Sequence, residues 1–252
     1  MRKIIATGKG GVGKTTSLSA LCQIMSSEGK RVIVFDTDPS MNFALGFGVP
    51  FDKVSTITED TAEISGHLED EGIEVSGEDI LRDHSVLTED GIRIVIMGAI
   101  MSGGDGCLCS AISLIKILLN YAEGTGDYDV AIVDSQAGPE VLGRGLASEF
   151  DINMILTEPT AKSSEVSRQV MKLGKDLGVK NTLLVVNKVI DEDDLTSTAE
   201  LVGVDVDSTI GIRFDKSVIK ADREGKLLLD AFPESDAAMD IKALAVKVKS
   251  LI

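Results

Sequence analysis

The sequence predicts an α/β protein with a doubly wound, mostly parallel sheet and helices on both faces. Short apolar runs of strand length alternate with stretches whose apolar residues recur at helical spacing. A glycine-rich loop separates the first such run from the first helical stretch. At 252 residues and 43% hydrophobic content, the chain is long enough for one complete core. We therefore expect a single domain over residues 1–252.

The elements follow from these patterns in chain order. Runs rich in Val, Ile and Leu predict strands at residues 4–7, 31–35, 92–97, 130–134, 152–156, 182–187 and 209–211. Apolar residues three and four positions apart predict helices at residues 14–27, 111–122, 141–148, 163–177, 192–201 and 237–251. Residues 52–90 carry thirteen Asp and Glu against two Lys and Arg. They predict an acidic, partly irregular insertion with one or two short helices.

The glycine-rich loop, residues 8–16, reads GKGGVGKTT and fits the pattern G-x-x-x-x-G-K-[ST]. Between a strand and a helix, such glycines let backbone N–H groups turn toward a phosphate, and the helix adds its positive N-terminal end. Lys14 is expected to reach the outer phosphates, and Thr15 to place its hydroxyl on Mg²⁺. The predicted nucleotide contacts are Gly10, Gly11, Val12, Gly13, Lys14, Thr15 and Thr16.

Aspartates end two of the expected strands. Asp36 and Asp38 follow the second strand, and Asp134 ends the run at 130–134. Ligands of doubly wound sheets bind at the carboxyl ends of strands, so these carboxylates would face the phosphates. Beside Mg²⁺ and a triphosphate, one carboxylate can hold the metal while another orients or deprotonates the attacking water.

A second lysine, Lys9, lies inside the loop, and KGGVGKTT resembles the deviant phosphate loop of the MinD/ParA/nitrogenase-reductase group of ATPases. The resemblance implies an ATP-dependent homodimer in which Lys9 acts on the nucleotide of the partner subunit. It assigns Asp38 to water activation in switch I, and Asp134, with Gly138, to the metal-sensing switch II. Asp36 is a further candidate for the magnesium shell.

The stretch VVNKV, residues 185–189, ends another expected strand. The same resemblance implies that Asn187, in an N-K pattern with Lys188, binds the adenine edge. An amide offers both a donor and an acceptor, which suits adenine N6 and N7. Arg213 stands where the family more usually has a proline, in the loop that lines the base.

Two cysteines one residue apart, Cys107 and Cys109, follow a glycine-rich turn and precede an apolar helical stretch. Two thiols cannot complete a four-ligand metal site, but a two-fold dimer would supply four. Thiols at a helix N-terminus ionise more easily, which favours metal capture. A redox pair and small apolar packing residues are the alternatives.

Residues 97–109, 134–138 and 143–145 also resemble CooC-type maturation ATPases, which help to insert nickel into carbon monoxide dehydrogenase. The resemblance extends from the phosphate loop to about residue 190. It implies that Cys107 and Cys109 from two subunits bind one Ni²⁺ or Zn²⁺ at the dimer interface. It also implies a client metalloenzyme, with carbon monoxide dehydrogenase as the first expectation.

Composition argues against other classes of function. A net charge of −16 opposes binding to phosphate backbones, so we expect no nucleic-acid partner. No apolar run approaches the roughly 20 residues that span a bilayer, and the first residues lack a signal-peptide pattern. Three cysteines do not form a disulfide scaffold. We therefore expect a cytoplasmic protein.

Two alternative functions remain open. A spatial-positioning ATPase of the MinD/ParA kind would use an amphipathic C-terminal helix on a membrane. That helix would present Ile241, Leu244, Val248 and Leu251, which core packing also explains. An iron–sulfur electron donor would need a switch II cysteine, and residues 135–148 contain none. Cys22 is expected in the core, and His67 and His84 at the surface.

Overall fold

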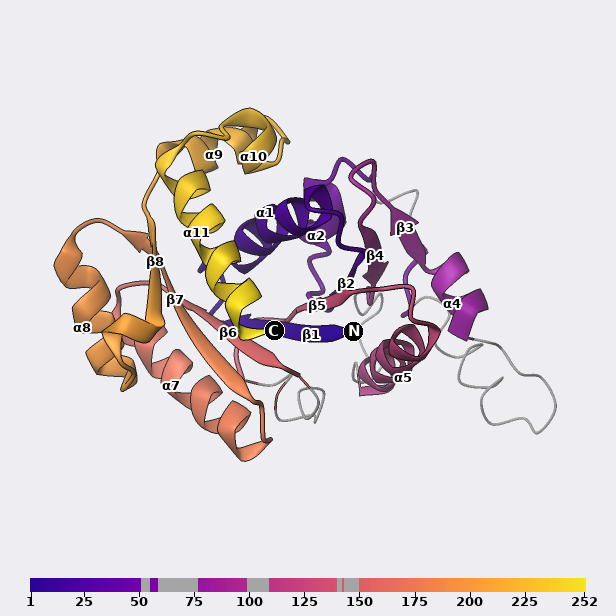
Figure 1. The fold of residues 1–252 in the computed structure, drawn as a ribbon, viewed down its shortest axis with the longest axis horizontal. Coiled ribbons are helices and arrows are strands. Elements are labelled where there is room, and N and C mark those ends of the chain that lie inside the picture. Colours follow the sequence, from indigo (N-terminus) through magenta and orange to yellow (C-terminus); the bar gives the residue numbers. More distant parts are fainter. Residues whose placement is uncertain (51–54, 59–76, 99–108, 140–141, 143–149) are drawn as a thin grey trace, which may run out of the picture.

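A single twisted sheet organises the computed structural model, which describes residues 1–50, 55–58, 77–98, 109–139, 142 and 150–252 (Figure 1). Its strand order is β3-β4-β2-β5-β1-β6-β7-β8, and only β3 runs antiparallel to its neighbour within this part of the chain. The strands are β1 (Arg2–Gly8), β2 (Val32–Asp36), β3 (Ser85–Leu87), β4 (Arg93–Ile96), β5 (Val130–Asp134), β6 (Ile152–Thr157), β7 (Asn181–Val189) and β8 (Thr209–Arg213).

Helices cover both faces of this sheet. They are α1 (Lys14–Ser27), α2 (Asn42–Gly46), α4 (Gly77–Asp83), α5 (Cys109–Thr125), α7 (Ala161–Asp176), α8 (Glu192–Val202), α9 (Lys216–Arg223), α10 (Leu228–Ala231) and α11 (Asp236–Leu251), with a 3₁₀ turn at Val206–Ser208. Successive residues of one strand face opposite layers. Ile4 packs in the core with α1 and α11, whereas Ile5 packs in the core with α5. The predicted fold class is confirmed.

The predicted elements recur with small shifts at their ends. The first helix has the predicted bounds, and all seven expected strands are present. Cys22 is fully buried, as predicted. The stripe of Ile241, Leu244 and Val248 is buried in the core that includes α1, which confirms core packing. The expected helix at 141–148 and most of the acidic insertion lie outside the described residues.

Short elements were missed. β3 is a three-residue edge strand, and α2 and α10 span five and four residues. Segments of this length show too few periods for a pattern to be recognised. α9 was missed because only Val218, Ile219 and Ala221 interrupt its polar sequence.

The surface assignment of His84 is wrong. The side chain is buried between α4 and β3, with Nδ1 3.1 Å from Ser55 Oγ. A histidine can be buried where a hydroxyl partner satisfies its ring nitrogen, and sequence alone did not reveal that partner. His67 lies outside the described residues.

Parallel pairing brings the strand ends of the predicted site together. Asp134 pairs in register with Ala6 on one side and with Asp36 on the other. The carboxyl ends of β1, β2 and β5 therefore meet at one edge of the sheet. The phosphate-loop sequence leaves the sheet at this edge.

Gly8 joins β1 to this loop, and a side chain there would disrupt the sheet. Its φ is +142°, and an added Cβ would lie 2.1 Å from the Leu156 carbonyl oxygen of β6. We expect Gly8→Ala to lower the free energy of unfolding by about 3 kcal/mol or more, because backbone must move. Urea denaturation measures the change. In the control, Gly29→Ala, nothing lies within 4 Å of the added Cβ, so only backbone strain of about 1 kcal/mol remains. Equal losses in the two variants would contradict the predicted clash.

Candidate nucleotide site

The loop between β1 and α1 has the backbone geometry that the motif predicts. Gly11 and Gly13 have φ of +77° and +93°, a region that residues with a Cβ rarely enter. Gly13 caps α1 in this conformation. A Cβ on Gly13 would lie 2.2 Å from Asn187 Nδ2, so any larger residue there would displace the Asn187 side chain. The first turn of α1 faces the loop with free N–H groups, which suits an anion.

Lys14 is held inside this loop. Its Nζ donates to the carbonyl oxygens of Gly8 and Lys9 at 3.5 and 3.4 Å. Burial lowers the pKa of Lys14, and the nearby Asp134 and Asp38 carboxylates partly oppose that shift. Both loop contacts are long for hydrogen bonds, so a phosphate oxygen can replace them at little cost.

Asp134 is the buried carboxylate at the centre of the site. Its Oδ2 accepts a hydrogen bond of 2.7 Å from Thr15 Oγ1, and burial raises its pKa. Its Oδ1 is buried with no hydrogen-bond partner among the described residues. An unpartnered carboxylate oxygen beside a hydroxyl suits a hard cation such as Mg²⁺, because an unpaired buried charge is costly.

Asp36 has a different environment. It is fully buried, and burial followed by repulsion from Asp134 raises its pKa. Its two oxygens accept backbone N–H groups of Asp38 and Phe43 at 3.0 and 3.2 Å. Asp36 therefore holds the start of the 37–43 segment in place, and Asp134 is the better placed of the two carboxylates for Mg²⁺.

Asp38 lies at the mouth of the site, half-buried. Its Oδ1 accepts hydrogen bonds from the backbone N–H and the hydroxyl of Ser40, at 2.9 and 2.7 Å. These bonds orient the carboxylate. The geometry is compatible with the water-activating role that the resemblance implies.

Asn187 and Lys188 contact the phosphate loop from β7. Asn187 Nδ2 donates to the Val12 carbonyl at 2.7 Å, and its Oδ1 accepts from the Lys188 N–H at 2.9 Å. Lys188 has φ of +63° at a β-bulge, and its Nζ donates to the Gly11 carbonyl at 2.9 Å and to the Glu158 carboxylate. Sequence reasoning assigned no role to Glu158, although it follows β6 at the same sheet edge as the aspartates.

A cavity of about 360 Å³ adjoins Asn187 and the loop. Phe214, which is 46% exposed, lines it together with residues of α9 and α11. A ring of this kind offers an apolar face for a base. The loop that the sequence marked as base-lining therefore does line this cavity, and the guanidinium of Arg213 is bonded to Asp236 and Asp240.

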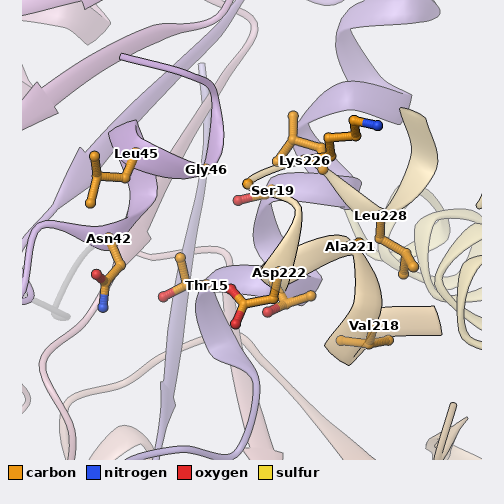
Figure 2. Close-up of a pocket in the computed structure, with 13 residues that line it drawn as sticks. Thr15, Ser19, Asn42, Leu45, Gly46, Val218, Ala221, Asp222, Lys226 and Leu228 are labelled. Carbon is orange, nitrogen blue, oxygen red and sulfur yellow. The ribbon is translucent and has the colours of Figure 1, made fainter. Parts of the chain in front are cut away.

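A second cavity, of about 630 Å³, adjoins the first turn of α1 and α9 (Figure 2). Asn42 and Leu45 of α2 line one wall, and residues of the α9–α10 region line the other. Thr16, Val218 and Asp222 line both cavities. Space for a ligand therefore flanks the first turn of α1 on two sides.

The paired cysteines are only partly described. Cys107 lies outside the described residues, and Cys109 is the first residue of α5. Within the described ranges, no three His, Cys, Asp or Glu residues gather as a metal site would require. Among the helices in those ranges, none is both long and apolar enough to cross a membrane.

Comparison with known proteins agrees with this geometry. Residues 3–229 match the family model for the CobQ/CobB/MinD/ParA nucleotide binding domain. The chain is 35% identical over 236 residues to an uncharacterized ATP-binding protein of Methanocaldococcus jannaschii, covering 89% of this chain and 90% of that protein. It is 31% identical over 245 residues to the carbon monoxide dehydrogenase accessory protein CooC of Rhodospirillum rubrum, covering 92% and 90%.

A solved structure shows the same fold. The septum site-determining protein MinD of Pyrococcus horikoshii, complexed with Mg-ADP, has a TM-score of 0.75 and 20% identity. The alignment covers 99% of this chain and 96% of that one.

The free oxygen of Asp134 generates a testable prediction. If Asp134 Oδ1 binds Mg²⁺, the affinity for ATP will be higher with Mg²⁺ than with EDTA. Asp134→Asn should then reduce the ratio of these two affinities about tenfold. Titration with a fluorescent ATP analogue, with and without Mg²⁺, measures it. Asp129→Asn, a change at a half-buried residue just before the same strand, serves as the control and should leave the magnesium-dependent gain in ATP affinity intact. An Asp134 variant with the full magnesium effect would rule out this site.

Proposed function

Because the chain belongs to the CobQ/CobB/MinD/ParA nucleotide-binding family and is an ATPase, we propose that it is a metal-delivery ATPase. In this proposal a homodimer couples its nucleotide state to the binding of nickel or zinc by Cys107 and Cys109. The observation that carries it is the C-x-C sequence of Cys107 and Cys109, in a chain 31% identical to a carbon monoxide dehydrogenase accessory protein.

The carboxyl end of β4 lies beside the aspartate that ends β2. Ile96, the last residue of β4, pairs in register with Asp36, and the Met97 N–H donates to the Asp36 carbonyl at 2.9 Å. β4 therefore ends at the nucleotide edge of the sheet. Cys107 and Cys109 follow β4 in the sequence, and the proposal couples the two sites through this connection.

In this proposal, residues at the carboxyl ends of the parallel strands bind ATP and hydrolyse it. Loop N–H groups and Lys14 bind the phosphates, and Asn187 and Lys188 fix the loop beside the base. Thr15 and Asp134 hold Mg²⁺, which neutralises phosphate charge when bound. Asp38 orients the attacking water. Lys9, half-buried in the loop, acts on the nucleotide of the partner subunit.

The metal ion is the cargo of this cycle. ATP closes the dimer and brings four thiols together, and hydrolysis separates them, so the nucleotide changes metal affinity only through its preference for the closed state. The client is a metalloenzyme, carbon monoxide dehydrogenase or a related one. We treat residues 1–252 as one ATPase domain and place it in the cytoplasm, where thiols stay reduced.

A spatial-positioning ATPase of the MinD/ParA kind is the second candidate. Similarity to the septum site-determining protein MinD of Buchnera aphidicola, at 27% identity over 244 residues, favours it. The apolar face of α11 on which membrane binding would depend is buried, with Ile241, Leu244 and Val248 at most 2% exposed.

Metal binding distinguishes these functions. We expect one Ni²⁺ or Zn²⁺ per dimer, and we expect Cys107→Ser and Cys109→Ser each to abolish binding, because four thiolates are needed. Anaerobic equilibrium dialysis with metal analysis, with and without ATP, measures the stoichiometry. Cys22→Ala is the matched control, since Cys22 is fully buried in the core. Unchanged stoichiometry in the double serine variant would contradict metal delivery.

Vesicle flotation tests the second candidate. With its apolar face packed inside, α11 should not carry the protein to vesicles of anionic phospholipid, with or without ATP. Flotation that appears only with ATP would favour spatial positioning over metal delivery.

A further inference from the structure

One arginine ties the corner between β8 and α9 to the first two turns of α11. Arg213 Nε and Nη2 each donate to an oxygen of Asp240 at 2.8 Å, and Nη1 donates to Asp236 Oδ1 at 2.7 Å. The backbone N–H of Arg213 donates to Asp240 Oδ2 at 2.9 Å. A planar guanidinium that meets a carboxylate in two bonds has a defined orientation. Asp240 thus fixes both the main chain and the side chain of Arg213.

A return contact reinforces this corner. Asp215 Oδ2 accepts the Ala237 N–H at 3.2 Å, and its Oδ1 accepts the Ser217 N–H at 2.7 Å. Ala237 belongs to α11 and Ser217 to α9. The same corner therefore holds the starts of both helices.

Phe214 lies between these two anchored residues. Its own N–H donates to the Val189 carbonyl at 2.8 Å. Its ring is 46% exposed and lines the cavity of about 360 Å³ beside Asn187. Ala237 and Ile241 of α11 line the same cavity. Arg213 therefore joins two walls of the cavity, β8–α9 and α11, which belong to separate segments of the chain.

We infer that Arg213 is a positioning residue for the nucleoside: its bonds to Asp236 and Asp240 hold Phe214 and α11 as a preformed cavity for the base. A proline at this position would restrict the backbone through its ring, whereas here a side-chain clamp provides the rigidity. Preformed walls avoid the cost of ordering a loop during binding. The inference rests on the nucleotide site of the proposed function and is independent of the metal cargo.

Two ligands separate base positioning from phosphate binding. Isothermal titration of the full chain with Mg-ATP and with Mg-tripolyphosphate gives an affinity for each. We expect Arg213→Ala to weaken ATP binding about five- to tenfold, because the loop must then be ordered on binding, and to leave tripolyphosphate binding unchanged. Asp240→Ala should reproduce this effect. Arg213→Lys should recover little of it, because one ammonium cannot replace the bidentate fork.

Arg31 provides a matched control. Its backbone N–H, Nε and Nη2 donate to Asp129 at 2.9, 3.2 and 2.9 Å, the same arrangement at the amino edge of the sheet. Arg31→Ala should change stability to a similar extent and leave both affinities unaltered. Equal weakening of both ligands in Arg213→Ala, or weakening of neither, would overturn the inference. Failure of the unaltered chain to bind either ligand would instead contradict the nucleotide site itself.

Discussion

The burial of the Asp134 carboxylate is the constraint on which the site depends. A charge placed between two strands inside a sheet is costly unless a partner compensates it. The described part of the chain supplies a hydrogen bond from Thr15 and the nearby ammonium of Lys14, and within it the other carboxylate oxygen has no hydrogen-bond partner. A divalent cation would compensate the carboxylate oxygen that the fold leaves without a partner, and the same cation would bind phosphate oxygens. Binding of a nucleotide with its cation would therefore reduce the cost of burying the Asp134 carboxylate at this edge of the sheet.

Parallel pairing makes this arrangement possible. The strands β1, β2 and β5 run in the same direction. Their register places Ala6, Asp36 and Asp134 side by side near the carboxyl ends of these strands. The same rule brings Glu158 and Lys188 from β6 and β7 beside the loop. Charged residues that are distant in sequence thereby become one cluster, and the helices on both faces keep water from the strands beneath it.

Different structural features shape the two parts of the candidate nucleotide site. Glycine conformations and backbone N–H groups shape the phosphate loop, and these follow directly from the motif. Side chains from β8, α9 and α11 shape the cavity that we propose for the base, through contacts between segments more than 20 residues apart. The first feature is local and the second is tertiary, so they can be altered separately by substitution.

The sequence by itself determined the fold class, the order of the predicted helices and strands along the chain, and the residues of the phosphate loop. Motif and period are local properties, and local backbone geometry at Gly11, Gly13 and Lys14 follows from them. Only the tertiary structure decided that Asp36 is bonded to backbone N–H groups while Asp134 keeps a free oxygen, because that difference depends on neighbours from other segments. It likewise decided the burial of His84 and the clamp of Arg213 on α11. In the sequence each is one polar residue, and its partner is defined only when the chain has folded.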